Sequence, residues 1–151
     1  NSSNSVNTGF LGDVRVYTLP PTGDTISAGW TPSTGTDLYA MIDETPPDGD
    51  TTYNSAATVG LKYEVDMTDL PSDVVNVYGV QTVAMMEKDA AGSCGVTMSV
   101  DSAGSLGVGS EKAISTNYVY WQDVFDKDPN TTSAWTRTSV NATKMKMEKT
   151  T

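Results

Sequence analysis

The stretch Leu61-Lys62-Tyr63-Glu64-Val65-Asp66-Met67 decides the fold class, because it alternates strictly between apolar residues at odd positions and charged residues at even positions. Successive side chains of a β-strand point to opposite faces, so this period of two predicts a strand with one buried face and one face in water. Strands of this kind are typical of antiparallel sheets. We therefore expect residues 61–67 to form one strand of an antiparallel sheet.

Outward from this stretch, the chain consists of short strand-like segments separated by turn residues. No segment keeps a 3.6-residue apolar period over ten positions, and only residues 133–141 have room for a helical turn. The longest strand candidate, residues 74–88, is apolar on both faces and is expected at the centre of a sheet. The other candidates are residues 13–19, which Pro20-Pro21 ends, and residues 38–42, 95–100, 106–114, 117–125 and 144–149.

The number and spacing of these segments predict an all-β fold. About eight strands separated by turn signals favour a two-sheet antiparallel β-sandwich, with a jelly roll as the favoured connection, and less than about a tenth helix. We expect residues 10–151 to form one domain, and the polar residues 1–9 to be a linker or tether from an upstream part of a longer, trimmed chain. The strongest apolar strands supply the residues expected between the two sheets: Val77, Val83, Val96, Tyr120 and Val124.

The composition excludes most familiar active sites. Nine Lys and Arg against nineteen Asp and Glu give a net charge of −10, and the chain contains no His and one Cys. It can therefore form no Ser-His-Asp triad, no Cys-His pair and no internal disulfide, and we expect no catalytic residues and no enzyme. The acidic balance argues against nucleic-acid binding. The longest apolar run, near residues 80–86, is too short to span a membrane, so no membrane partner is expected.

An acidic loop is the first candidate binding site. Asp43, Glu44, Asp48 and Asp50 lie close together around Pro46-Pro47. Hard oxygen ligands in a stiffened loop suit Ca²⁺, and a structural Ca²⁺ is the only cofactor that the sequence suggests. The spacing matches no EF-hand loop, so the alternative is a solvated acidic loop without metal.

A group of aromatic residues is the second candidate. Tyr118, Tyr120 and Trp121 lie in one strand candidate, where the two tyrosines share a face and Trp121 takes the opposite one. Exposed aromatic rings are the platforms on which sugar-binding modules hold glycans, which predicts a glycan site here. The alternative is that one set packs the core and the other forms cross-strand pairs.

Two further candidates are weaker. Paired carboxylates hydrolyse glycosides, but Glu64, Glu87 and Glu111 each lie where a solvent-facing charge is expected. Cys94 has no neighbouring basic residue in the sequence and is expected to be inert.

An ordered set of short phrases carries a family resemblance, although none of them is a catalytic signature. It runs from about residue 7 almost to the C-terminus and resembles a family of tailed-bacteriophage virion structural proteins with concanavalin-like jelly-roll domains. The phrases are Phe10-Leu11-Gly12-Asp13-Val14-Arg15-Val16, Thr18-Leu19-Pro20-Pro21-Thr22-Gly23-Asp24, Trp30-Thr31-Pro32-Ser33-Thr34-Gly35, Tyr39-Ala40-Met41-Ile42-Asp43-Glu44, Asp69-Leu70-Pro71, Gly79-Val80-Gln81, Lys88-Asp89-Ala90-Ala91-Gly92, Ala113-Ile114-Ser115-Thr116-Asn117-Tyr118, Asp128-Pro129 and Trp135-Thr136.

The resemblance implies a non-enzymatic structural protein located in the virion, as a capsid decoration or as a tail or fibre component. Its expected partners are other virion proteins and copies of itself, with a homotrimer favoured in a fibre. The alternative function is a carbohydrate-binding module that contacts host-surface glycans. The chain departs from the family at residues 144–149, whose Lys-bearing alternation predicts a sheet edge or a subunit contact.

Overall fold

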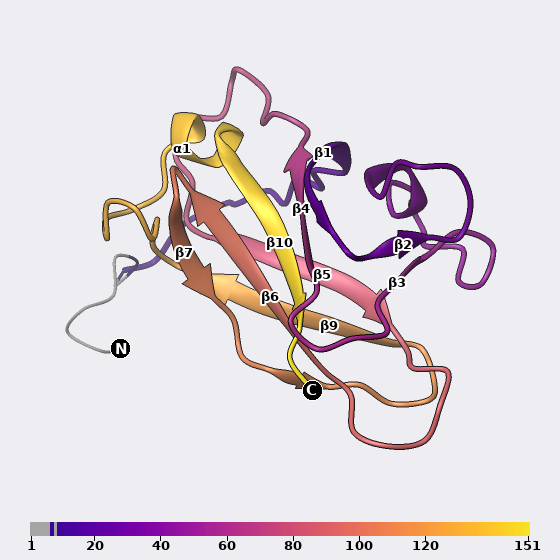
Figure 1. The fold of residues 1–151 in the computed structure, drawn as a ribbon. Helices are drawn as coiled ribbons and strands as arrows, with labels where there is room; N and C mark the ends of the chain where they lie inside the picture. Colours follow the sequence, from indigo (N-terminus) through magenta and orange to yellow (C-terminus); the bar gives the residue numbers. More distant parts are fainter. Residues whose placement is uncertain (1–6, 8) are drawn as a thin grey trace.

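The computed structural model describes residue 7 and residues 9–151, and in it the chain forms two layers of antiparallel β-structure (Figure 1). The larger layer, here called the main sheet, has the strand order β1-β4-β10-β6-β7, and β8 pairs with β6 beside this path. Its strands are β1 (Pro21–Ala28), β4 (Lys62–Met67), β6 (Gly95–Ser102), β7 (Ser105–Val108), β8 (Lys112–Ala113) and β10 (Thr143–Lys149).

The smaller layer is a two-stranded ribbon of β5 (Val80–Met86) and β9 (Val119–Phe125), called the β5–β9 ribbon below. Its inward side chains, among them Ala84 and Trp121, pack against the core of the main sheet. The remaining elements are the pair β2 (Thr31–Pro32) and β3 (Asn54–Ser55), the 3₁₀ helix η1 (Tyr39–Met41) and the helix α1 (Arg137–Asn141). Helix makes up 6% of the chain and strand 37%, which confirms an all-β fold with antiparallel sheets; the jelly-roll connection stays a prediction.

The core lies between the main sheet and the ribbon. Tyr63 and Val65 of β4, Met98 of β6 and Met147 of β10 point inward and are buried. The alternation of residues 61–67 therefore predicted the inner face of β4 correctly. On the outer face Glu64 is buried as well, and its carboxylate accepts a hydrogen bond from Thr25 of the neighbouring strand at 2.8 Å, which compensates for the lost contact with water.

The prediction of the residues between the sheets was wrong for most of the set. Val96 is buried and Val77 is half-buried beside a second cluster around Trp135, but Val83, Tyr120 and Val124 are 51%, 59% and 67% exposed. The register explains this result, because these three residues lie opposite Gln122, Met85 and Gln81, all on the outward face of the ribbon. The ribbon has only one layer to pack against, so one of its two apolar faces stays open.

Three strand predictions were also wrong. Residues 13–19 form no strand and pair with no other strand, although they alternate as a strand does. Residues 38–42 contain the helix η1 instead of a strand. The two carboxylate oxygens of Asp24 accept hydrogen bonds from the backbone N–H groups of Leu38 and Tyr39, at 2.7 and 2.8 Å, and so hold the chain in a turn there. Residues 74–79 precede β5 as an irregular segment, since β9 pairs only with residues 80–86.

The last strand is central, whereas the sequence predicted an edge or a subunit contact. β10 pairs with β4 on one side and with β6 on the other. Its lysines are tolerated there because Lys144 and Lys146 lie on the outer face of the sheet, where Lys144 Nζ is 3.5 Å from Glu64 Oε1. The predicted helical turn within residues 133–141 is confirmed as α1.

Two predictions from the sequence fall at the margins of the described chain. The expected tether at residues 1–9 lies outside the described residues except for Asn7, whose amide donates to the carbonyl oxygen of Tyr78, and Gly9. In the part of the chain that the structure describes, no helix has the length and apolar character needed to cross a membrane.

Candidate functional site

A cleft of about 1050 Å³ lies between the β5–β9 ribbon and the segment 41–57, and it is called the cleft below. The ribbon sits over the β7–β8 side of the main sheet, where a Cβ added to Gly107 would lie 3.1 Å from the Phe125 ring. On the inner face of β4 only Met67 is left partly exposed, beside the partly exposed Met145 of β10, whereas Tyr63 and Val65 are buried. The floor of the cleft consists of Tyr63, Val65, Met67, Met145 and Met147. One wall is formed by residues 83–86 of β5, and the other wall is formed by Trp30, Met41 and Ile42.

Trp30 fixes the wall of the cleft opposite β5. Its ring meets that of Tyr63 edge to face, with centroids 4.9 Å apart and an interplanar angle of 76°, a favourable arrangement for two aromatic rings. Trp30 therefore packs, partly buried, at the margin of the core. Among the described residues, the buried Trp30 Nε1 and Asn54 Oδ1 atoms have no hydrogen-bond partner.

The four carboxylates of the predicted Ca²⁺ site lie along the rim of this cleft. Glu44 Oε1 and Asp48 Oδ1 lie 2.6 and 2.8 Å from the Thr52 hydroxyl oxygen and share its one hydrogen, while Asp50 accepts a hydrogen bond from the Tyr118 hydroxyl at 2.7 Å. Asp43 lies on the same rim and is exposed. Within residue 7 and residues 9–151, no group of three or more metal-ligating side chains is arranged to hold an ion. The loop's carboxylates are thus directed to hydroxyl groups.

Tyr118 closes one end of the cleft. Gly49 adopts a φ of 69°, and a Cβ at this position would lie 3.6 Å from the Tyr118 ring, so a glycine fits both the backbone and the contact. Desolvation, the hydrogen bond to Asp50 and the charge of Glu87 raise the pKa of Tyr118 above its ordinary value. The phenol therefore remains a hydrogen-bond donor, directed at the acidic rim.

The three aromatic residues of the predicted glycan site are divided between the two faces of the ribbon. Tyr118 and Tyr120 are exposed, whereas Trp121 packs inward against the core. Within β9, Tyr120 lies on the outward face and Trp121 on the inward one, as the alternation of a strand requires, whereas Tyr118 precedes β9 and directs its hydroxyl to Asp50. A glycan in the cleft would contact Tyr118 and Tyr120.

The three glutamates considered for glycoside hydrolysis lie in different places. Glu64 lies on the outer face of the main sheet, Glu87 on the rim of the cleft, and Glu111 beside a second pocket of about 440 Å³. A glycosidase needs two carboxylates on either side of one bond. This arrangement supplies no such pair from these three residues.

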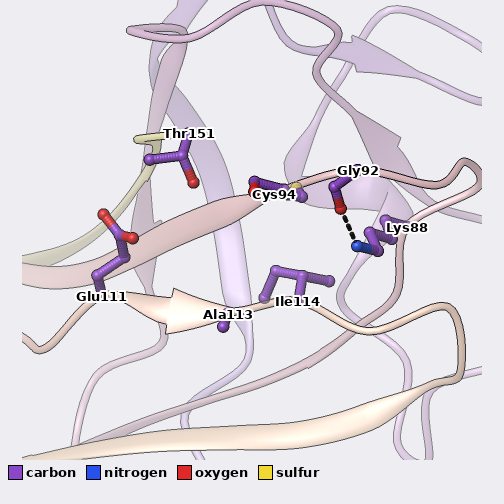
Figure 2. A pocket seen from close by; sticks show the side chains of 8 residues that line it. Lys88, Gly92, Cys94, Glu111, Ala113, Ile114 and Thr151 are labelled. Carbon is purple, nitrogen blue, oxygen red and sulfur yellow. Dashed lines mark hydrogen bonds between the residues drawn. The ribbon is translucent and has the colours of Figure 1, made fainter.

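The second pocket contains Cys94 and lies at the end of β6 (Figure 2). Figure 2 shows Glu111 and Thr151 on one side of Cys94, and Lys88 bonded to the carbonyl oxygen of Gly92 on the other. Cys94 has no basic neighbour in the sequence, but the fold places Lys149 Nζ 3.3 Å from its sulfur. The pairing of β10 with β6 produces this contact, which no local pattern could have indicated.

Sequence reasoning also missed a buried ion pair between the two layers. Lys112 Nζ of β8 lies 2.8 Å from Asp123 Oδ1 of β9, and the two side chains are 9% and 14% exposed. The Ser110 hydroxyl accepts a further hydrogen bond from Lys112 at 2.7 Å. The inward position of Asp123 in an apolar strand could have indicated this ion pair, since a buried charge requires a partner.

No known protein family, curated protein or solved structure matched the chain when it was compared with them.

Proposed function

We propose that the protein is a non-enzymatic structural component of a tailed-phage particle, a capsid decoration or a part of a tail or fibre, and that it acts by multivalent assembly. The sequence phrases quoted above point to the virion. One observation supports assembly: Val83, Tyr120 and Val124 lie together on the outward face of the ribbon, each more than half exposed. An exposed apolar surface on a sheet is typical of a contact with another protein.

Two further features fit docking to neighbouring subunits. β5 and β9 pair only with each other among the described residues, so each has a free edge that another strand can use. The carboxylates lie on the rim of the cleft and the net charge is −10, so contacts between copies should strengthen as salt screens repulsion. Weak contacts suffice on a particle, because many copies raise the effective concentration.

A pair of matched valine variants tests this proposal. Val124→Ser changes the outward face of the ribbon, and Val108→Ser changes an equally exposed valine, at 62%, on β7 of the main sheet. We expect sedimentation velocity to show concentration-dependent association of the full chain, which Val124→Ser weakens and Val108→Ser leaves unchanged. Equal effects of the two variants, or a monomer at every concentration and salt, would contradict self-assembly through this face. Absence of the protein from purified particles would contradict the virion role.

Carbohydrate binding is the second candidate function, and the position of Tyr118 favours it. Tyr118 and Tyr120 both line the cleft, and the Asp50 and Glu87 carboxylates beside Tyr118 are acceptors for hydrogen bonds from sugar hydroxyls. A glycan array followed by calorimetry tests this candidate. Tyr120→Ala should abolish binding, whereas Tyr53→Ala, an exposed tyrosine on the opposite side of the cleft, should retain it. Binding that both variants retain would exclude the Tyr120 side of the cleft as the site.

A further inference from the structure

The ion pair of Lys112 and Asp123 is the shortest and most enclosed ion pair among the described residues. Lys112 Nζ lies 2.8 Å from Asp123 Oδ1, and the two side chains are 9% and 14% exposed. The other two ion pairs are 3.5 Å long, and each includes a side chain that is at least 34% exposed. The enclosed pair has lost much of the hydration of both charges, a cost that conversion to a neutral product would remove.

The two carboxylate oxygens of Asp123 have different surroundings. Oδ1 accepts hydrogen bonds from Lys112 Nζ at 2.8 Å, from the Ser110 backbone N–H at 3.3 Å and from the Ser110 hydroxyl at 3.2 Å. Oδ2 is buried and has no hydrogen-bond partner among the described residues. It lies against Gly109, where an added Cβ would be only 2.2 Å from it. One oxygen is therefore held by three donors, and the other has an open position for a proton.

Two hydroxyl groups lie beside the amine and the carboxylate. Ser110 Oγ accepts a hydrogen bond from Lys112 Nζ at 2.7 Å and donates one to Asp123 Oδ1, so it bridges the two charged groups. Thr82 is paired directly opposite Asp123 in the β5–β9 ribbon, and its buried hydroxyl has no partner within the described part of the chain. Opposite Cβ atoms in an antiparallel pair are about 4.5–5.5 Å apart, so this hydroxyl is a near neighbour of the carboxylate. Both hydroxyls are placed to pass protons from nitrogen to oxygen.

We propose that Lys112 and Asp123 condense in the folded chain to an isopeptide bond, an amide that joins β8 of the main sheet to β9 of the ribbon. Lys112 Nζ gives up a proton and attacks Asp123 Cγ, and the bond between Cγ and Oδ2 breaks. Oδ2 takes two protons, both from the original ammonium group, and leaves as one water molecule. The amide keeps one hydrogen on nitrogen, and Oδ1 becomes its carbonyl oxygen. Ammonium and carboxylate thus give amide and water, with no oxidant and no cofactor.

The fold supplies what this reaction lacks between free groups in water. Groups held in contact react as if each were present at about 10⁵–10⁸ M. The negative charge that develops on Oδ1 during the attack is met by the Ser110 N–H and hydroxyl groups, which are already in place. The reaction starts from the ion pair, so a freshly folded chain contains the pair and an older one contains the amide. This inference goes beyond the proposed function and does not depend on it.

The mass of the denatured chain tests the bond. The native chain should become lighter than its sequence by one water molecule, in a fraction that grows with incubation after purification. Lys112→Arg keeps the positive charge but removes the attacking amine, and should abolish this loss. Lys144→Arg, in a pair whose lysine is 37% exposed, is the matched control and should retain it. Digestion with trypsin and chymotrypsin, which cleaves after Tyr118, should leave one piece that carries both Lys112 and Asp123.

Two further variants test the leaving group and the proton relay. Asp123→Asn replaces the leaving oxygen by nitrogen, so its product should be lighter by one ammonia molecule and not by one water molecule. Ser110→Ala keeps the amine and the carboxylate but removes the bridging hydroxyl, and should slow the conversion about a hundredfold. An unchanged rate in Ser110→Ala would overturn the assigned relay.

The remaining outcomes decide the proposal without reference to assembly. A native chain that keeps its full sequence mass after prolonged incubation overturns the isopeptide bond. A loss of water that Lys112→Arg retains also overturns it and points to imide formation elsewhere, for example where Asp48 precedes Gly49. If Lys112→Arg does not fold, the digest of the native chain decides alone, and recovery of Lys112 and Asp123 only on separate peptides overturns the bond.

Discussion

The main sheet and the β5–β9 ribbon are built from the same kinds of residue but differ in what surrounds them. β6 has neighbours on both edges and is buried along nearly its whole length. β9 has one partner, and most of its side chains alternate between partly buried and exposed. The number of neighbours, more than the apolar character of the strand, decides burial here. We therefore expect mutations in the main sheet to change stability, and mutations on the outward face of the ribbon to change association.

The ion pair that joins the two layers gives the largest expected effect. Asp123→Ala leaves Lys112 charged and nearly buried without its carboxylate, which should lower the free energy of unfolding by about 3–5 kcal/mol. Urea denaturation measures the loss. The double variant Lys112→Met with Asp123→Leu removes both charges and should lose much less. A double variant as unstable as Asp123→Ala would show that volume, and not unpaired charge, sets the cost.

The next largest effect on stability comes from comparing a substitution in the core with one on the outward face of the ribbon. Met98 of β6 is 0% exposed, so Met98→Ala should lower the free energy of unfolding by about 3 kcal/mol, through lost burial and the cavity left behind. Val83→Ala, on the outward face of β5, should change it by less than about 0.5 kcal/mol. The same denaturation experiment, run on monomeric protein, measures both. Similar losses in the two variants would mean that Val83 is covered in solution.

The helix α1, which follows β9 and precedes β10 in the chain, gives a smaller effect on stability. Thr136 caps α1 by accepting the backbone N–H of Ser139 at 3.0 Å, and the Ser139 hydroxyl accepts the backbone N–H of Thr136 at 3.0 Å in return. Thr136→Ala should therefore lower the free energy of unfolding by about 1 kcal/mol. Thr138→Ala, exposed in the same helix, is the matched control and should lose less. Equal losses would contradict a specific contribution of the cap, because alanine has a higher helix propensity than threonine.

The smallest effect concerns alkaline pH. Burial raises the pKa of Tyr63, in the main sheet, far above its ordinary value of 10.0. Below pH 10 both the folded and the unfolded chain carry a neutral phenol, so the stability contributed by Tyr63 is fully present. Above it the unfolded chain ionises first and stability falls. Stability measured between pH 9 and 11 should fall less in Tyr63→Phe than in the native chain. Tyr120 is 59% exposed, so Tyr120→Phe serves as the control.

Local patterns predicted the strands that have partners inside the chain. The alternation of residues 61–67 identified β4, and the segments at 95–100 and 117–125 identified β6 and β9, because the period of two reflects faces that these strands do have. Residues 13–19 have the same period and form no strand, since periodicity carries no information on whether an edge is free. The same limit explains β10, whose lysines predicted an edge although the sheet accommodates them on its outer face.

The candidate site was predictable only in its parts. The acidic loop and the tyrosines were identified as groups, and Tyr118 bonded to Asp50 joins the two, although they lie 68 residues apart in the sequence. The cleft itself depends on where the ribbon stops covering β4, which is a property of layer packing. The exposure of Val83, Tyr120 and Val124 has the same origin, because the sequence shows two apolar faces but not how many layers are present to cover them.

The central place of β10 has a consequence for biosynthesis. Its two neighbours, β4 and β6, both precede it in the chain, and in the described structure they meet only through β10. While the ribosome is still translating residues 95–142, a nascent chain can form the β1–β4 and β6–β7 hairpin-like pairs but cannot close the sheet between them. Folding of the main sheet must therefore wait until residues 143–149 leave the exit tunnel. Until then the inner faces of β4 and β6 are exposed to chaperones and to other nascent chains.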